Sequence, residues 1–412
     1  MSKTSFRNTL YTNDNLYVLS GLNSGLVDLI YLDPPFNSKR TYSAPVGSKA
    51  AGASFKDMWT WKDVDEYYLD TLAANFPALA RYIASVGKIS GKAMMAYLTY
   101  MAQRVIEMYR VLKDTGSLYL HCDPTASHYL KLLLDSIFGK QGFRNEIIWC
   151  YRGGGSPKND FGRRHDIIFR YAKSNKLVFN ADAVRVPYQA EGINRKDDAM
   201  WGKHKGTERV YKPHPLGKIP EDWWRIDVLN ANDSERTGYP TQKPLAILHR
   251  VIKASSKEDD IVLDPFCGCA TTCVAAQQLG RKWIGIDIEK QAASVLVERL
   301  SDDAGLFKDF VATDQIPKRN DLKEEPPVES VKQRLYKQQQ GKCGGCGQDF
   351  AIQNLEIDHI IPRAKGGGDY YENYQLLCGS CNRIKSIRPM EYLRMKIEIR
   401  EKMLNAQVFF GE

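Results

Sequence analysis

A double proline fixes where one strand of this chain must end. The apolar run VDLIYLD, residues 27–33, has the composition of a buried strand, and Pro34, Pro35 and Phe36 follow it at once. Proline donates no backbone hydrogen bond, so it is excluded from the interior of a sheet. The sequence therefore predicts that a strand ends at Asp33 and passes into a stiffened loop carrying a carboxylate and an aromatic ring.

Short apolar runs alternate with amphipathic stretches along most of the chain. A long helix is expected at 91–116, closed by Gly116, and the expected strands are residues 27–33, 117–122, 146–151, 260–264 and 282–288. This alternation is typical of βαβ units and predicts an α/β fold with a parallel sheet. Residues 40–90 interrupt the pattern, and we expect them to form an excursion above the sheet that can close over a ligand.

The regular pattern stops after residue 150 and resumes at residue 237, which divides the chain into parts. The predicted parts are residues 1–150 and 237–314 as two halves of one domain, 151–236 as an insertion, 315–330 as a linker and 331–412 as a small cysteine-containing module. The linker prediction rests on the polar, proline-bearing composition of that segment.

The positive charge of the chain is concentrated in two of these parts. Residues 151–236 contain 17 Lys and Arg against 12 Asp and Glu, and residues 331–412 contain 13 against 9, which together account for the net charge of +9. Two basic regions favour a polyanionic partner, DNA or RNA, although mild basicity is equally typical of a solvated face. With no membrane-spanning run and no signal peptide, we expect a cytoplasmic protein without a membrane partner and with reduced cysteines.

Four of the nine cysteines form two CxxC pairs, and this spacing favours a metal site over disulfides. The pairs are Cys343 with Cys346 and Cys378 with Cys381. Four thiolates are a donor set typical of structural zinc, which closes all coordination positions to chemistry. The other cysteines lie in or beside apolar segments and are expected to be small buried hydrophobes: Cys122, Cys150, Cys267, Cys269 and Cys273.

The segment DIVLDPFCGCATTCVAAQQLGRKWIGIDI has the form of a site for an adenosyl cofactor. A strand ends at Asp264, a turn of small residues lets a ligand approach the backbone, and a helix begins near Ala270. The next strand ends at Asp287, where a carboxylate can accept both ribose hydroxyls. Alone, this pattern is also that of an ordinary strand-to-helix turn.

Several motifs together resemble the permuted, β-class DNA methyltransferases, which use S-adenosylmethionine to methylate adenine N6 or cytosine N4. The motifs are NDNLYVL, YLDPPFN, YPTQKPLAILHRVI, DPFCGCATT and WIGID, in that order. The resemblance implies a Rossmann-like, doubly wound sheet. It implies that residues 1–150 are the catalytic half, 151–236 the target-recognition region and 237–314 the cofactor-binding half.

The resemblance also assigns cofactor contacts to individual residues. It implies that the methionine and ribose are lined by Asp264, Phe266, Gly268 and Asp287, that the carboxylate end is closed by Thr241, Gln242 and Lys243, and that Asp14 and Asn15 lie near the adenine. Two positions depart from the family pattern, because Ala270 and Asn13 stand where glycine is usual.

In this family the loop formed by Asp33, Pro34, Pro35 and Phe36 is catalytic. An exocyclic amine is a poor nucleophile because its lone pair is conjugated into the base, and acceptors on its two N–H groups weaken that conjugation. The Asp33 carboxylate and the Pro34 carbonyl are the implied acceptors, and Phe36 offers a face for an extruded base. An Asp at this position favours adenine N6. The alternative for DPPF alone is a plain strand-ending turn.

Residues 343–386 resemble a zinc-stapled HNH, or ββα-metal, nuclease. The resemblance implies that His359 is the general base, that Asn373 orients its imidazole, and that Asp358 with Asn382 holds Mg²⁺ or Mn²⁺ at the scissile phosphate. Asp358 and Asn382 stand where histidines are usual. The alternative is a zinc module that only grips DNA.

Three functions remain open from the sequence. The first is an adenine methyltransferase fused to a metal-dependent endonuclease, a restriction and modification pair in one chain acting on double-stranded DNA. The second keeps the methyltransferase with a non-catalytic DNA-binding module, and the third is a nucleotide-binding regulator. Methyltransferases of this motif order are often homodimers, and the oligomeric state of this chain stays open. Candidate DNA contacts are Arg152, Lys158, Arg163, Arg164, Lys203 and Lys205, with Trp223 and Trp224 either packing or stacking.

Overall fold

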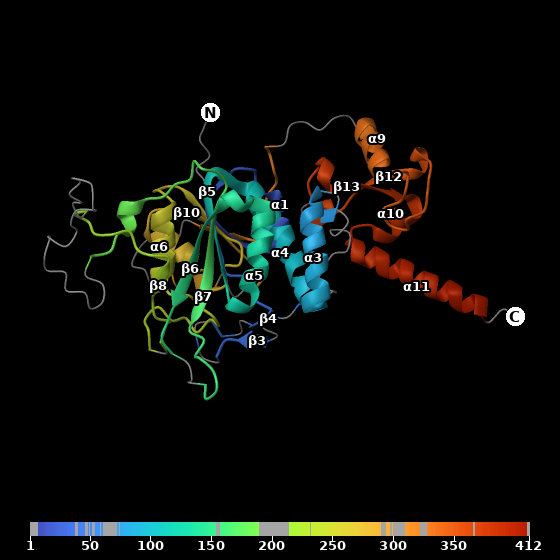
Figure 1. Ribbon diagram of the computed structural model, residues 1–412. Coiled ribbons are helices and arrows are strands. Elements are labelled where there is room, and N and C mark those ends of the chain that lie inside the picture. The colour runs from blue at the N-terminus through green and yellow to red at the C-terminus, as the bar shows by residue number, and fades with distance from the viewer. Residues whose placement is uncertain are drawn as a thin grey trace, which may run out of the picture.

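The computed structural model describes residues 7–37, 40–45, 48, 50–51, 54–57, 59–60, 72–73, 75–153, 157–188, 214–230, 232–289, 294–296, 299, 310–321, 328–365 and 367–409. Within these residues, helices cover both faces of a large sheet, and a smaller module formed by residues 328–409 lies beside it (Figure 1). The predicted DNA contacts Lys203 and Lys205 lie outside the described residues.

The sheet has nine strands in the order β11-β1-β10-β9-β2-β5-β7-β6-β8. The bounds are β1 Asn8–Thr12, β2 Val27–Leu32, β5 Leu112–Cys122, β6 Phe143–Cys150, β7 His165–Ala172, β8 Trp223–Arg225, β9 Ile261–Asp264, β10 Lys282–Asp287 and β11 Phe310–Thr313. From β9 the chain winds toward β10, whereas from β2 it winds toward β5, so the winding direction reverses between two neighbouring strands.

The helices form two separate cores on the two faces of the sheet. They are α1 Asn15–Gly21, α3 Pro77–Ser90, α4 Lys92–Val111, α5 Pro124–Phe138, α6 Leu245–Ser255 and α7 Thr271–Gln278, with 3₁₀ turns at Lys140–Gly142 and Ala181–Val184. Alternate residues of β2 divide between the cores: Ile30 and Leu32 pack with α1, α3, α4 and α5, while Leu29 and Tyr31 face α6 and α7. The doubly wound architecture is thereby confirmed.

The prediction of a parallel sheet is wrong for one strand. β7 pairs antiparallel with both β5 and β6, while the pairs formed by β1, β2, β9, β10 and β11 and the pair of β6 with β8 are parallel. The described residues between β6 and β7, 151–153 and 157–164, contain no helix, whereas a parallel connection needs a long crossover that is usually helical.

The long helix predicted for 91–116 ends five residues earlier than expected. Its last residue is Val111, and β5 begins at Leu112 without an intervening loop, so Gly116 lies inside a strand instead of closing a helix. Leu112 pairs with Val27 and Ser117 with Leu29, so the polar residues 113–116 lie in a bulge between these two pairs. A Cβ at Gly116 would lie 2.9 Å from the Asp28 carbonyl oxygen, so close backbone approach, and not helix termination, requires this glycine.

The interruption predicted at 40–90 is only in part an excursion. β3 Arg40–Ser43 and β4 Ser54–Asp57 form a separate antiparallel pair after the double proline. Helix α3, however, places Leu79, Ile83 and Val86 in the main core against α4.

The segment 151–236, predicted as an insertion, contributes two strands to the main sheet. In the main sheet, β7 lies between β5 and β6, and β8 forms the edge beyond β6. Trp224 is buried with its ring 5.0 Å from the Arg250 guanidinium, whereas Trp223 is 54% exposed. Of the two tryptophans, Trp224 therefore packs and Trp223 remains free to contact a ligand.

The C-terminal module has its own small core around an antiparallel hairpin. Its elements are α9 Val328–Gln338, β12 Leu355–His359, β13 Tyr374–Cys378, α10 Gly379–Lys385 and α11 Met390–Phe409, with 3₁₀ turns at Ile352–Asn354, Arg363–Lys365 and Tyr371–Asn373. Cys343, Cys378 and Cys381 are themselves part of this core. Helix α11 points away from the rest of the molecule toward the C-terminus (Figure 1).

Candidate active sites

A cavity of about 1010 Å³ lies at the carboxyl ends of β2, β9 and β10. It sits where the winding direction reverses, which is where ligands bind in open α/β sheets. It is lined by every residue assigned to the cofactor or to the catalytic loop: Asp14, Asn15, Asp33, Pro34, Pro35, Phe36, Thr241, Gln242, Lys243, Asp264, Phe266, Gly268 and Asp287. The fold thus brings together residues that are widely separated in the sequence.

The two oxygens of Asp33 have different environments. Oδ2 forms an ion pair with Nζ of Lys243, whose Nζ also donates to the Thr241 carbonyl, 3.2 Å away. Oδ1 is buried and has no hydrogen-bond partner among the described residues. A buried acceptor without a partner is costly, so this oxygen is suited to receive an N–H group of a ligand.

The Phe36 ring lies on a buried hydrogen-bonded chain that the sequence did not predict. It stacks on His121, with ring centroids 6.0 Å apart. His121 Nδ1 lies 2.8 Å from the Tyr31 hydroxyl, and Nε2 lies 3.2 Å from Asp166 Oδ2. Burial would raise the pKa of Asp166, but the hydrogen bond and charge of His121 lower it overall. A carboxylate can only accept, so Nε2 donates to Asp166 Oδ2, and in the neutral imidazole Nδ1 then accepts from the Tyr31 hydroxyl.

Asp264, which is buried, and Asp287, which is partly buried, are two further carboxyls in the lining of the cavity. Burial raises the pKa of Asp264 to about 7 and that of Asp287 to about 6. Asp264 accepts from the Thr272 hydroxyl and from the Phe266 amide, and Asp287 accepts from the Gly268 amide at 2.7 Å. The turn between the two strands is thus fixed by the carboxyls that face the cavity.

Left-handed backbone in this turn explains its small residues. Gly268 has φ of 50°, and a Cβ there would meet the Tyr239 ring at 3.0 Å. Ala270, which stands where the resembled motif has glycine, also has positive φ, at 58°. That conformation costs an alanine about 1 to 2 kcal/mol, so the departure is tolerated at some expense of stability.

Asp14 and Asn15 tie three parts of the cavity wall together. Asp14 caps α1 by accepting from the Leu16 amide and pairs with Arg104 of α4 at 2.9 Å. Asn15 accepts from Arg104 Nε and donates to the Pro265 carbonyl at 2.7 Å. Arg104, which the sequence did not single out, is buried and links α4 to both residues.

The three residues predicted to close the carboxylate end of the cofactor differ in their contacts. The side chains of Thr241 and Gln242 bond within their own loop, whereas that of Lys243 bonds to the catalytic loop. Gln242 accepts from Thr237 and donates to the Glu235 carbonyl at 2.6 Å, so its side chain holds its own loop. Thr241 has φ of 62°, and its hydroxyl donates to the Pro240 carbonyl. Lys243 instead reaches the catalytic loop through Asp33. Its approach to Asp33, across 210 residues, gave no signal in the sequence.

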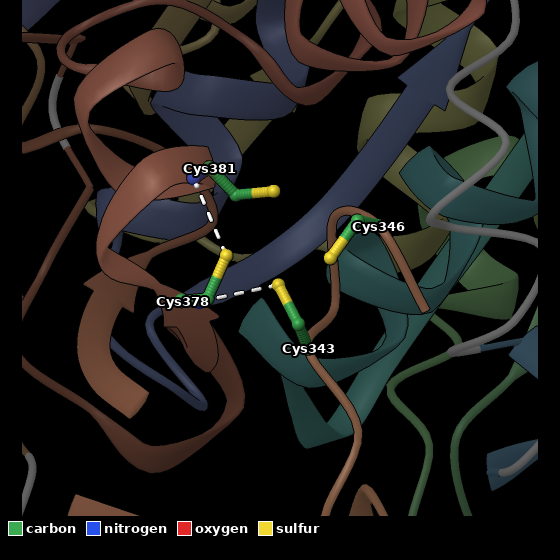
Figure 2. Close-up of side chains that lie close together, drawn as sticks. All are labelled: Cys343, Cys346, Cys378 and Cys381. Carbon is green, nitrogen blue, oxygen red and sulfur yellow. Dashed lines mark hydrogen bonds between the residues drawn. The ribbon is translucent and has the colours of Figure 1, made fainter. Parts of the chain in front are cut away.

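The four cysteines of the CxxC pairs converge on one point in the C-terminal module (Figure 2). One ligand atom from each lies within 4.8 Å of the others. The Cys378 amide donates to Cys343 Sγ at 3.1 Å, and the Cys381 amide to Cys378 Sγ at 3.5 Å. Amides directed at sulfurs stabilise thiolates, so the donor set fits a tetrahedral metal such as zinc.

The imidazole of His359 is hydrogen-bonded to a carboxylate, that of Asp369, and not to the predicted partner Asn373. Its Nε2 lies 2.6 Å from Asp369 Oδ1, and Arg363 Nε donates to the same oxygen at 2.8 Å. Asn373, predicted to orient the imidazole, is buried and hydrogen-bonds with the backbone of Ile361 and Gly368. It therefore shapes the loop that follows His359, and the contact to the ring comes from Asp369.

Asp358 and Asn382, predicted to share a divalent ion, are each engaged elsewhere. Asp358 Oδ2 lies 2.9 Å from Nζ of the buried Lys385 and accepts from Gln375 at 2.8 Å. Asn382 donates its amide to Glu356. Of these two side chains, Asp358 Oδ1 and the Asn382 amide oxygen are the hard donor atoms that these contacts leave unused. This set suits Mg²⁺ or Mn²⁺ only where substrate phosphate completes the coordination.

The predicted DNA contacts within the described residues are exposed. Arg152, Lys158, Arg163 and Arg164 lie in or beside the loop between β6 and β7, where Phe161 is 93% exposed. Arg163 is 3.9 Å from Asp160, an exposed pair of little energetic weight. In the described part of the chain, no helix combines the length and apolar character needed to cross a membrane.

Comparisons with known proteins match two parts of the chain to two families. Residues 27–298 match the family described as DNA methylase, and residues 343–388 match the family described as HNH endonuclease. The type II methyltransferase M.HpaI of Haemophilus parainfluenzae is 33% identical over 231 residues, which cover 55% of this chain and 66% of that protein. The DNA adenine methyltransferase YhdJ of Escherichia coli K12 is 27% identical over 294 residues, 71% of this chain and 82% of that protein.

Among solved structures, the PvuII DNA methyltransferase, described as cytosine-N4-specific, aligns over 75% of this chain and 96% of its own, with 15% identity and a TM-score of 0.46. The chain covers 66% of the length of M.HpaI. It also covers 66% of the length of M.BglII from Bacillus subtilis, so each match spans just under two thirds of the relative.

Proposed function

The chain belongs to the DNA methylase family and carries a C-terminal HNH endonuclease domain, and from this premise we propose that it methylates an exocyclic amine of a DNA base. The methyl donor is S-adenosylmethionine, and the favoured target is adenine N6. S-adenosylmethionine supplies an electrophilic methyl group when bound. The cavity residues Asp264 and Asp287 would hold its methionine and ribose, and their carboxyls suit the ammonium and hydroxyl donors of that cofactor.

The observation that carries this proposal is the unpartnered Oδ1 of Asp33 beside those carboxyls. Lys243 occupies Oδ2 and so leaves Oδ1 for the target amine. The Pro34 carbonyl would accept the second N–H, and the Phe36 ring would stack on the extruded base. Acceptors on both N–H groups weaken the conjugation of the nitrogen lone pair with the base, so that the lone pair can attack the methyl group. A nucleotide-binding regulator would have no use for this arrangement.

The test of the proposal is product identity. Purified protein is incubated with unmethylated double-stranded DNA and S-adenosylmethionine, and the digested nucleosides are separated by mass. We expect N6-methyladenine. N4-methylcytosine would keep the methyltransferase and overturn the adenine assignment, and absence of any methylated base would overturn the proposal.

The pKa values of the two carboxyls predict that cofactor binding depends on pH. Asp287 has a pKa of about 6, and Asp264 of about 7. Only an ionised carboxyl accepts two donors. Lowering the pH through the two pKa values therefore protonates Asp264 and Asp287 and removes the ionised form that binds the cofactor. Below the pKa of Asp287 both carboxyls become protonated, so each further pH unit lowers affinity about a hundredfold, about tenfold for each carboxyl. Calorimetric titrations at pH 5.5, 6.5 and 7.5 should show tightening with pH, and Asp287→Asn should weaken binding and flatten the profile. Equal affinity at all three pH values would contradict the assignment.

We further propose that the HNH domain cleaves DNA with Mg²⁺ or Mn²⁺. His359 would activate water, oriented by Asp369, which Arg363 holds in place. Asp358 Oδ1 and the Asn382 amide oxygen would hold the ion together with the scissile phosphate, and the four cysteines would hold a structural zinc. Together the two activities would make a restriction and modification pair in one chain. We propose double-stranded DNA as partner, contacted through Arg152, Lys158, Arg163 and Arg164, and a homodimer remains an expectation from family resemblance.

His359→Ala should abolish strand breakage while methylation persists. Loss of a general base lowers rates by about 10² to 10⁴. The measurement is nicking of supercoiled plasmid with each metal, and the matched control is His249→Ala, which removes a half-buried histidine of α6 that contacts Gln278. Nicking by neither metal in the unaltered protein would favour the module that only binds DNA. Equal nicking by His359→Ala would refute the role of His359.

A further inference from the structure

The C-terminal module forms part of the wall of the cofactor cavity. The cavity that contains Asp33, Asp264 and Asp287 is also lined by residues 360–362, Tyr370, Glu372, Asn373 and 389–391. The first of these segments directly follows His359. One continuous cavity therefore joins the residues proposed for methyl transfer to the loop that carries the proposed nuclease base.

This part of the wall is held rigidly by the buried Asn373. Its side chain accepts from the Ile361 amide at 2.9 Å and donates to the carbonyls of Ile361 and Gly368. The Ile360 amide donates to the Asn373 carbonyl at 2.8 Å. A ligand that contacts residues 360–362 therefore contacts backbone that is hydrogen-bonded to Asn373 and directly follows His359.

Residues 320 and 321 of the segment predicted as a linker are bound to the methylase domain, at the loop that follows α1. Asn23 and Asn320 exchange two hydrogen bonds, of 2.6 and 3.0 Å, and the Ser24 amide donates to Asp321 at 2.8 Å. Asp321 is partly buried, which would raise its pKa, but hydrogen bonds from Arg319 and Ser24 hold that pKa well below its usual value. These contacts hold residues 320 and 321 against the loop that follows α1.

Gly21 at the end of α1 allows this approach. A Cβ at this position would overlap the Pro317 carbonyl oxygen and lie 3.2 Å from the Ile316 side chain. Gly21 has no positive φ, so an alanine there suits the helix itself and is excluded only by the bound segment.

Tyr370 connects the bound segment, the methylase domain and the cavity. The Arg319 guanidinium lies 5.5 Å from its ring centroid. Burial raises the pKa of its phenol, and the charges that act on it come from Glu107 and Arg110 of α4 as well as Arg319. Glu107 lines the same cavity.

We propose that the C-terminal module completes the cofactor-binding site, so that cofactor binding and docking of the nuclease loop stabilise each other. The inference rests on the proposed binding of S-adenosylmethionine in this cavity. Because coupling between two equilibria is reciprocal, weakening the docking must weaken cofactor binding, and cofactor must order the nuclease loop.

The test uses the full chain in two measurements. Hydrogen exchange with and without saturating S-adenosylmethionine should slow in residues 315–321 and 360–373 as well as in 264–289. Calorimetry should give a dissociation constant at least about fivefold higher for Tyr370→Ala and for Gly21→Ala than for the unaltered protein. Two variants on different sides of the contact guard against misfolding of either one.

The matched control is Lys337→Ala, which removes an exposed side chain of α9 in the same module and should leave the dissociation constant unchanged. Protection confined to residues 264–289, with unchanged affinity in both variants, would overturn the inference while leaving the cofactor site intact. Failure of the unaltered protein to bind S-adenosylmethionine would instead overturn the proposed function on which the inference rests.

Discussion

Asp33→Asn should reduce methyl transfer by about three orders of magnitude with little change in folding. The substitution keeps the shape of the side chain but removes its charge. Lys243 donates to one oxygen of Asp33, so the asparagine would turn its only oxygen toward Lys243 and its NH₂ group toward the cavity. A donor would then face the N–H of the target amine in place of an acceptor. Losses of about 10² to 10⁴ follow removal of a single polarising or proton-accepting group.

The measurement is single-turnover transfer of labelled methyl to DNA, with S-adenosylmethionine binding followed separately by calorimetry. The control is Asp259→Asn, which changes an exposed aspartate with φ of 62° in the turn between α6 and β9, a conformation that asparagine adopts readily. Transfer by Asp33→Asn within tenfold of the unaltered rate would show that Oδ1 is not the acceptor for the amine.

The ends of the strands were predictable because local chemistry determines them. The double proline ends β2 before Asp33, and the carboxylates of β9 and β10 follow apolar runs. The carboxyl ends of neighbouring parallel strands meet at one edge, so the position of the cavity follows from the sequence. The boundary between α4 and β5 did not follow, since Leu112 pairs with Val27 ahead of a polar bulge, residues 113–116, that has no strand pattern of its own.

The partners of the site residues were less predictable than the residues themselves. Lys243 reaches Asp33 and His121 reaches Tyr31 across the fold, and neither distance is encoded in local spacing. Asn373 was assigned to the nuclease motif by resemblance, but its contacts to Ile361 and Gly368 depend on how the loop closes. Composition identified residues 315–330 as a linker, and composition alone does not reveal that residues 319–321 bind to the end of α1.

Cys378→Ser should release the metal and unfold the C-terminal module while the main sheet remains folded. The module has a small core, to which Cys343, Cys378 and Cys381 contribute directly, and structural zinc provides about 10 to 16 kcal/mol of binding free energy in comparable sites. Few other apolar groups replace that contribution. The sheet has two large cores of its own and contains none of the four cysteines. We expect one zinc per chain in the unaltered protein and loss of hydrogen-exchange protection in β12 and β13 of the variant.

Cys150→Ser is the matched control, since Cys150 is half-buried in β6 and lies outside the cluster. It should retain zinc and the protection of β12 and β13. If the module closes the cofactor cavity, Cys378→Ser should also bind S-adenosylmethionine more weakly, although its methylase residues are unchanged. Zinc loss with full protection of β12 and β13 would show that the hydrophobic core suffices to fold the module. Zinc loss that unfolds the module but leaves cofactor affinity intact would separate the structural role of the metal from the linkage between the two sites.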